Sequence, residues 1–335
     1  MNLAEQQDFM LRSPTLEDMP AVVEMLNACW SDTVGSRPFD MEEMRVDWAS
    51  PGFDYTQDIR LAMDGDQVVG HVSVWSRAPY VRNFVFARTH PAHRGRGIGA
   101  ALTRWGESRV AENIPLAPPN ARVTIGCDNF STHAAGAELL RELGYEHIRS
   151  GYEMKIEMAS PPPTPRLPEG ITIRSMIPNQ EEEAVFRAAD EAFRDHWGHV
   201  DRPFEESFAG WLHYVRNNPQ HDPEFFWMAM DGDQIAGLAL CVPKDTDDPD
   251  MCWVNSLSVR RPWRRRGVAL ALLHHAFGEA YRRGIRKVGL GVDASSLTGA
   301  TRLYEKAGMH VYRQLDAYQK ELRPGEDLST QQLDH

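Results

Sequence analysis

The sequence has 335 residues, of which 42% are hydrophobic and 25% are charged, and its formal net charge is −12. This is an ordinary globular composition, and the length favours about two domains. The acidic balance, with an isoelectric point near 5.5, argues against nucleic acid as the main partner, because phosphate backbones require a broad basic surface. The start of the chain lacks a cationic, apolar leader and no run of about 18 apolar residues occurs, so we expect a cytoplasmic protein that does not span a membrane.

The cysteines bear on the cellular compartment and on metal binding. None of the four lies in the close pairs that are typical of zinc fingers and redox motifs. We therefore expect free thiols in a reducing compartment, with neither a disulfide framework nor a metal ion. The four residues are Cys29, Cys127, Cys241 and Cys252.

The first half of the chain predicts an alternation of strands and helices. Thr15 is a candidate helix cap, and the Asp-Gly step at 64–65 predicts a tight hairpin. Expected strands lie at 9–12, 59–63, 67–75, 83–87, 122–127 and 148–158. Expected helices lie at about 15–26, 41–48, 98–112 and 134–143.

A proline-rich segment at 159–170 divides the chain. It holds five prolines in twelve residues, and such a segment runs as a semi-rigid, polyproline-like spacer because proline cannot donate to a strand ladder. We therefore predict an N-terminal domain at 1–158, a linker at 159–170, a C-terminal domain at 171–323 and a polar tail at 324–335.

The second half repeats the same order of elements. Expected strands lie at 171–174, 253–259, 287–292 and 311–322, with a hairpin closing at 231–233, and expected helices lie at 179–193, 204–217, 269–283 and 298–307. Related motifs recur 164 to 170 residues apart, such as Met63-Asp64-Gly65 and Met230-Asp231-Gly232. The chain is therefore predicted to be an internal duplication.

A cationic loop joins the strand at 253–259 to the helix that follows it. Five arginines lie within residues 260–266, and Gly267 then opens the helix. Free N–H groups and the positive end of the helix dipole favour an anion at such a helix start. The pattern is Arg-x-x-Gly-x-Ala from Arg264, and the first half has a second copy, Arg-x-x-Gly-x-Gly, from Arg94. Both loops are predicted to bind a pyrophosphate.

This pattern resembles the acetyl-CoA signature of the GNAT N-acetyltransferase superfamily, and the order of elements in both halves is similar to that of a GNAT domain. The resemblance implies an α/β (α+β) fold of two tandem GNAT domains, each a mixed, mostly antiparallel sheet flanked by helices. It also implies acetyl-CoA as the co-substrate and direct attack of an amine on the thioester, without a covalent enzyme intermediate and without a metal.

The resemblance further implies where CoA binds. In GNAT domains the pantothenate arm lies between the fourth and fifth strands and the pyrophosphate lies on the loop. In the second half this implies Leu257, Val259, Arg264, Arg265, Arg266, Gly267, Val268 and Ala269. In the first half it implies Arg94, Gly95, Gly97 and Gly99.

The two halves differ where chemistry is expected. The family pattern Leu-Tyr-x-x-x-Gly is present at 303–308, so Tyr304 is a candidate general acid toward the leaving CoA thiolate. The corresponding residue of the first half is Leu140, which carries no proton to donate. We therefore expect the C-terminal domain to be catalytic and the N-terminal domain to be CoA-binding or structural.

The proton acceptor is less directly indicated. Many GNAT enzymes carry a Glu on the fourth strand, and residues 253–259 contain none. Asp195 and His196 follow the first helix of the second half, where GNAT domains form the acceptor pocket, so they are the candidates for relaying the amine proton. Asp250 and Glu191 remain alternatives.

Three functions stay open at this point. The first is acetylation of a primary amine of a small molecule by a monomer or homodimer. The tandem layout is also similar to that of the mycothiol synthases, which acetylate the cysteinyl amine of a sugar conjugate. The third is a non-enzymatic acyl-CoA sensor, against which Tyr304 argues.

Overall fold

The computed structural model of the chain describes residues 8–297 and 299–332. The start of the chain, on which the expectation about a leader rests, and Thr298, the predicted start of the last helix, lie outside the described residues. Contacts divide the chain into two compact units. Unit 1 comprises the chain up to Ile148 together with Asp316–Leu328, and unit 2 comprises Arg149–Leu315 and the chain from Ser329.

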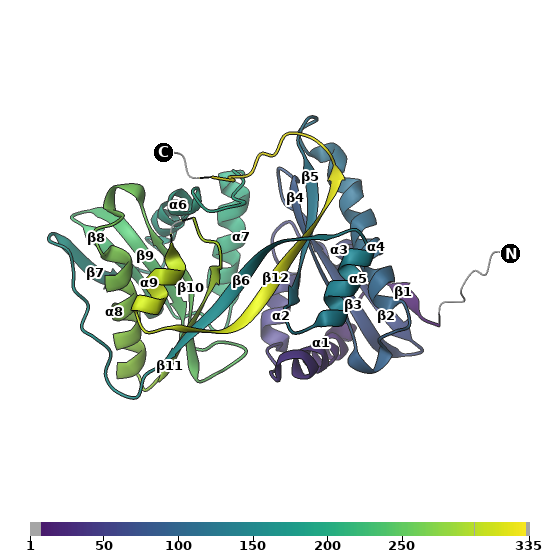
Figure 1. Cartoon of the computed structure of the whole chain (residues 1–335), viewed down its shortest axis with the longest axis horizontal. Coiled ribbons are helices and arrows are strands. Elements are labelled where there is room, and N and C mark those ends of the chain that lie inside the picture. The colour runs from purple at the N-terminus through teal and green to yellow at the C-terminus, as the bar shows by residue number, and fades with distance from the viewer. Residues whose placement is uncertain (1–7, 298, 333–335) are drawn as a thin grey trace. The chain divides into compact units, whose positions relative to one another are not determined.

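Unit 1 is a mixed sheet covered by helices (Figure 1). Its strands are β1 (Met10–Arg12), β2 (Ile59–Asp64), β3 (Gln67–Trp75), β4 (Arg82–Thr89), β5 (Val123–Phe130) and part of β12 (His310–Arg323), in the order β1-β2-β3-β4-β5-β12. Its helices are α1 (Met19–Val34), α2 (Met41–Trp48), α3 (Tyr55–Asp58), α4 (Ile98–Asn113) and α5 (Ala134–Glu142). The ladders from β1 to β4 are antiparallel, and β4 pairs with β5 in parallel.

Unit 2 repeats this arrangement. Its strands are β7 (Ile171–Ser175), β8 (Phe226–Asp231), β9 (Gln234–Val242), β10 (Met251–Val259), β11 (Lys287–Asp293) and β6 (Glu146–Glu157), in the order β7-β8-β9-β10-β11-β6. Its helices are α6 (Glu182–Phe193), α7 (Phe204–Asn217), α8 (Val268–Arg282) and α9 (Ala300–Lys306). Strands β10 and β11 pair in parallel, and the ladders β7–β8, β8–β9, β9–β10 and β11–β6 are antiparallel. The predicted mixed, mostly antiparallel α/β (α+β) fold is confirmed.

The last strand of each sheet comes from the other half of the sequence. In unit 2, β6 pairs antiparallel with β11, from Gly151↔Asp293 to Glu157↔Lys287. In unit 1, β12 follows β5 in the sheet, and its Tyr318 is 2% exposed within the core. The units therefore differ from the predicted domains 1–158 and 171–323, because the two final strands are exchanged.

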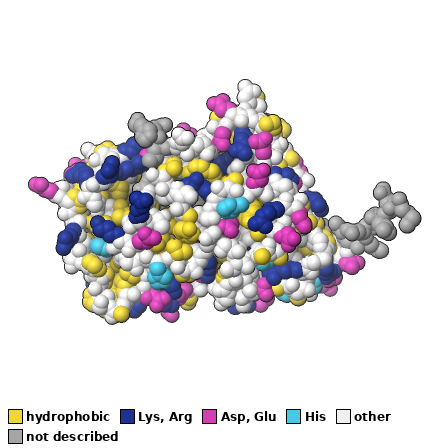
Figure 2. Space-filling view, viewed as in Figure 1, with side chains coloured by type: hydrophobic (Ala, Val, Ile, Leu, Met, Phe, Trp, Pro, Cys, Tyr) yellow, Lys and Arg dark blue, Asp and Glu magenta, His cyan; other side chains and the backbone are white. Residues whose placement is uncertain are grey.

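Each unit buries apolar side chains on both faces of its sheet. One cluster of unit 1 joins the sheet to α4 and α5, and another joins it to α1 and α2. Unit 2 has the corresponding pair of clusters, one with α8 and α9 and one with α6 and α7. On the face seen in Figure 2, acidic and basic side chains are interspersed. None of the described helices has the length and apolar character needed to cross a membrane.

Candidate functional site

In both units the two parallel central strands separate after a short ladder. The β4–β5 ladder runs from Arg82↔Thr124 to Phe84↔Gly126, although both strands continue for several residues beyond it. The β10–β11 ladder likewise ends at Val254↔Leu290. In unit 2 a bulge between Val254 and Ser256 interrupts the register of β10 against β9 at the same level, and bulges bend a strand away from its partner. Each unit thus has an opening between its central strands.

In each unit a helix begins nine residues after the first of these two strands ends: β4 ends at Thr89 and α4 begins at Ile98, and β10 ends at Val259 and α8 begins at Val268. Helices α4 and α8 begin directly after Gly97 and Gly267, whose φ angles of 78° and 91° are left-handed and suit glycine. Neither helix has a side chain that caps its first turn. The first N–H groups of both helices are therefore not occupied by a side-chain cap, and such groups can donate to an anion.

The signature arginine of unit 2 is held inside the protein. Arg264 Nε donates to the Val259 carbonyl (3.0 Å), its Nη2 donates to the Ala192 carbonyl (3.1 Å), and its Nη1 donates to Asp195. Arg261 Nε also donates to Asp195, at 2.9 Å. The hydrogen bonds of Arg264 therefore link the C-terminal end of α6 to the C-terminal end of β10.

These contacts determine the state of Asp195. Its side chain is 5% exposed, and hydrogen bonds from Arg261, with further bonds from Arg264, hold the pKa of its carboxyl far below the usual value. The carboxylate stays ionised and its oxygens are occupied by guanidinium donors. Unit 1 has the same type of ion pair, since Arg94 Nη1 lies 2.7 Å from Asp32 Oδ2 at the end of α1.

The other loop residues of unit 2 face outward. Arg265 has a left-handed φ of 62°, and Arg265, Arg266 and Gly267 are exposed. Within the described part of the chain, the guanidinium groups of Arg265 and Arg266 have no ion-pair partner. Val268 is buried and Ala269 is half-buried in the first turn of α8. The loop thus presents two cations and a row of N–H groups.

Tyr304 and His196 line one pocket of unit 2, which has a volume of about 160 Å³. Leu257 also lines this pocket, whereas Val259 lies at the end of β10. Burial raises the pKa of Tyr304 to about 12, so its phenol keeps its proton. Burial, with the charge of Arg264, lowers the pKa of His196, so its imidazole is neutral near pH 7. A phenol that keeps its proton and a neutral imidazole therefore line one pocket, which also includes Val254 and Leu290 at the end of the β10–β11 ladder.

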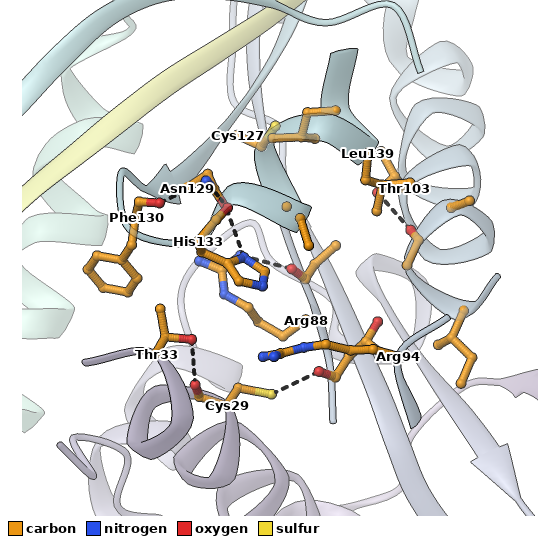
Figure 3. A pocket seen from close by; sticks show the side chains of 18 of the residues that line it. Cys29, Thr33, Arg88, Arg94, Thr103, Cys127, Asn129, Phe130, His133 and Leu139 are labelled. Carbon is orange, nitrogen blue, oxygen red and sulfur yellow. Dashed lines mark hydrogen bonds between the residues drawn. The ribbon is translucent and has the colours of Figure 1, made fainter. Parts of the chain in front are cut away.

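Unit 1 has a larger pocket of about 320 Å³ at its own opening. Arg94, Gly95, Gly97 and Gly99, the residues for which CoA binding is predicted, are among its lining residues, and Leu140 lines it from α5. A Cβ at Gly99 would lie 2.9 Å from a methyl carbon of Leu139, so a larger residue there would require the Leu139 side chain to shift. Figure 3 shows side chains of α1, β4 and the loop before α5 converging on this pocket.

Several residues in the unit 1 pocket were missed by sequence reasoning. His133 Nδ1 lies 3.1 Å from Asn129 Oδ1, while its buried Nε2 has no partner. Burial lowers the pKa of His133. Arg88 and Asp128 also line the pocket. For Asp128 and His133, the sequence signal was the polar segment that follows the strand at 122–127. Such a segment is equally typical of a surface loop, so it did not indicate a pocket.

Metal binding has no support among the described residues, where no group of three His, Cys, Asp or Glu side chains could hold an ion. His196 and His199, two histidines separated by two residues, are joined by a backbone hydrogen bond from His199 N to the His196 carbonyl. Asp250 and Glu191, the alternative carboxylates, do not line the pocket that holds Tyr304.

Comparison with known proteins gives consistent results at the level of family. The profile described as "Acetyltransferase (GNAT) family" matches residues 19–122 and 183–309. The chain is 30% identical to the mycothiol acetyltransferase of Salinispora arenicola, over 92% of this chain and 96% of that protein. It is 32% identical to the mycothiol acetyltransferase of Geodermatophilus obscurus, over 65% of this chain and 67% of that protein.

Two solved structures resemble the whole chain. The GCN5-related N-acetyltransferase from Sphaerobacter thermophilus superposes with a TM-score of 0.77 at 37% identity, covering 96% of this chain and 98% of that one. A tandem GNAT protein from the clavulanic acid biosynthesis pathway superposes with a TM-score of 0.69 at 14% identity, covering 95% and 100%. The second likeness concerns the fold alone.

Proposed function

Because the chain belongs to the acetyltransferase (GNAT) family and is an N-acetyltransferase, we propose that unit 2 transfers the acetyl group of acetyl-CoA to a primary amine of a small molecule. The observation that carries this proposal is the pocket between β10 and β11, which a protonated Tyr304 and a neutral His196 both line. The free N–H groups at the N-terminus of α8 supply donors for the pyrophosphate, and Arg264, four residues before this helix, contacts Asp195, which lines the same pocket.

The reaction needs two proton movements. The amine nitrogen attacks the thioester carbon, the carbon–sulfur bond breaks, and the acetyl group ends on nitrogen. We assign Tyr304 the proton that neutralises the leaving thiolate, and His196 the proton that the amine loses. Positioning both reactants in one pocket supplies a further part of the rate.

We assign Asp195 a positioning role. A carboxylate whose oxygens accept from two arginines, and whose pKa is held low, is a poor proton acceptor at neutral pH. Its contacts instead fix Arg264 against the end of β10. The pyrophosphate then meets the N–H groups from Arg266 to Ala269 and the outward cations of Arg265 and Arg266.

For unit 1 we propose binding of a CoA-type ligand without turnover. Its loop and α4 N-terminus have the same geometry as those of unit 2. Leu140 lines the pocket at the position corresponding to Tyr304 and cannot protonate a thiolate. The cation of Arg88, which also lines this pocket, disfavours a second cation such as an incoming ammonium.

A second candidate function is acetylation of the cysteinyl amine of a sugar conjugate. Its support is that relatives covering most of this chain carry the name mycothiol acetyltransferase, at 30% identity for the relative matched over 92% of the chain. Both candidate functions transfer an acetyl group from acetyl-CoA to an amine, and they differ in the molecule that carries the amine.

The test measures thiol release from acetyl-CoA with a panel of primary amines, which includes aminosugars, polyamines and a cysteinyl sugar conjugate. We expect release that depends on one class of amine, with stoichiometric N-acetylated product. Release with the conjugate alone supports the second candidate. An absence of amine-dependent release in wild-type protein that binds acetyl-CoA overturns the proposal for unit 2.

A further inference from the structure

Arg88 is a cationic side chain that lines the unit 1 pocket without a paired carboxylate. It projects from β4 into the unit 1 pocket (Figure 3), where its guanidinium carbon lies 4.9 Å from the ring centroid of Trp30 and 4.4 Å from that of Phe86. Its Nη1 donates to the Ala87 carbonyl at 2.8 Å. Among residues 8–297 and 299–332, no carboxylate lies within ion-pair distance of it.

The surroundings do not neutralise this charge by direct contact. Asp128 lines the same pocket and acts on Arg88 through space, without a hydrogen bond. His71, opposite Arg88 in the β3–β4 ladder, is buried, and burial lowers the pKa of its imidazole to about 3, so it is neutral. A guanidinium has five N–H donors, and most of those on Arg88 are unused. The Arg88 side chain is half-buried, and charged donors that are partly removed from water are stabilised when an anion meets them.

Unit 2 has no counterpart of this cation. Arg88 precedes Arg94 by six residues, and the residue six before Arg264 is Ser258. Both occupy the same ladder position, opposite His71 in unit 1 and opposite Leu238 in unit 2. The unit 1 pocket is also the larger, at about 320 Å³ against about 160 Å³. The pockets at the openings of the two units therefore differ in volume and in the charge of the residue at this ladder position.

The position of Arg88 along the pocket indicates which part of a ligand it meets. The pocket is lined by Gly95 and Gly97 of the loop before α4 and by Arg88, which lies one residue before the end of β4, whereas the opening between β4 and β5 begins after Phe84↔Gly126. A CoA thioester with its phosphates on the loop would direct its acyl end toward the start of this opening. The guanidinium of Arg88 lies over the ring of Phe86, two residues from Phe84, and therefore comes close to this end of the ligand. The pocket also has apolar walls, which include Leu139 and Leu140.

We propose that unit 1 binds the CoA thioester of a short dicarboxylic acid, of the malonyl or succinyl class, and that the terminal carboxylate of the acyl group pairs with Arg88. This rests on the proposed binding of a CoA-type ligand to unit 1 and adds the chemical class of its acyl group. A planar guanidinium held over two neighbouring rings presents its donor edge to a carboxylate in fixed geometry. Unit 2, with Ser258, keeps acetyl-CoA as its donor.

The test compares succinyl-CoA with butyryl-CoA, because the two acyl chains have equal length and differ in the carboxylate. Hydrogen exchange of peptides within 85–100, measured in the full chain against ligand concentration, reports the unit 1 site separately from unit 2. We expect succinyl-CoA to bind this site about tenfold to hundredfold more tightly, as for a hydrogen bond to a charged group. Arg88→Met should abolish the difference, and Arg88→Lys should keep part of it.

The matched control is Arg104→Met, which removes the same charge from an exposed position on α4 and should leave the preference unchanged. Equal affinity for the two thioesters in the wild type, or a preference that survives Arg88→Met, overturns the inference and assigns Arg88 to packing. If CoA protects 85–100 but the acyl group makes no difference, the binding proposal for unit 1 stands without the inference. If no CoA compound protects 85–100, both fail.

Discussion

Tyr304→Phe tests the assignment of the general acid. The substitution keeps the ring, which is 7% exposed within the core cluster of unit 2, and removes the hydroxyl. In the described structure the hydroxyl has no hydrogen-bond partner, so its loss should change the free energy of unfolding by less than about 1 kcal/mol. A change in turnover would therefore report chemistry and not folding.

The size of the effect follows from the acidity of the two groups. Positioned proton transfer contributes about 10²- to 10⁴-fold. A thiolate whose conjugate acid has a pKa near 8.5 is a fair leaving group, and burial raises the pKa of Tyr304 to about 12. Full transfer of the proton to the thiolate is thus uphill, so the phenol assists as a hydrogen-bond donor. We expect a loss at the lower end of the range, about hundredfold in kcat, or about 2.7 kcal/mol.

The assay follows thiol release at saturating acetyl-CoA and amine, together with calorimetric affinity for CoA. Tyr304→Phe should lower kcat and leave CoA affinity nearly intact from pH 6 to 9, because the phenol keeps its proton well above this range. Tyr281→Phe, which removes a phenol from α8 outside the pocket, is the control. A Tyr304→Phe enzyme that turns over like the wild type at every pH would refute the assignment and leave Tyr304 as packing.

Three other variants test the remaining assignments. Gly267→Val forces a β-branched residue to a φ of 91° and should weaken CoA binding to unit 2 about tenfold to hundredfold by calorimetry, whereas Gly278→Ala within α8 should not. His196→Gln should remove the acid limb of the kcat profile, which in the wild type falls as pH drops through a pKa below 6.5. Because the unfolded chain binds this proton more readily, the contribution of His196 to stability also falls below pH 6.5. Truncation after Leu315 removes Tyr318 from unit 1 and should lower the calorimetric melting temperature of unit 1. Truncation after Leu328 should leave that melting temperature unchanged. Equal melting temperatures of unit 1 in the two truncated proteins would contradict the strand exchange.

The exchanged strands change how the halves can be studied. A fragment that ends at residue 158 lacks the part of β12 that completes the unit 1 sheet. Its Tyr318, 2% exposed in the unit 1 core, would be missing as well. Binding to unit 1 is therefore best measured in the full chain.

Local signals predicted most elements correctly. The apolar spacing at 204–217 predicted α7, and α7 is Phe204–Asn217. The Asp-Gly steps at Gly65 and Gly232 predicted two hairpins, and both glycines have a φ of 57°. The family prediction also rested on short motifs, and it is confirmed. Such signals can be recognised because their physical causes, capping, periodicity and glycine φ, act within a few residues.

The exchange of β6 and β12 could not be predicted in this way. The strands expected at 148–158 and 311–322 both fit the edge of either sheet, since local alternation does not specify a pairing partner. The interaction partners of side chains could not be predicted either, because local sequence does not specify which distant residues come into contact. Asp195 was a candidate proton relay by its position after a helix, and the structure places it between Arg261 and Arg264.

The sequence by itself determined the duplication, the order of elements, the two glycine-containing loops that precede α4 and α8, and the difference between Tyr304 and Leu140. The tertiary structure decided which strand completes each sheet and which charges meet. Arg88 shows the reason most clearly, because an arginine on a strand is usually solvated. Its position over Trp30 arises from a contact between β4 and α1, and these two residues lie more than fifty positions apart in the chain.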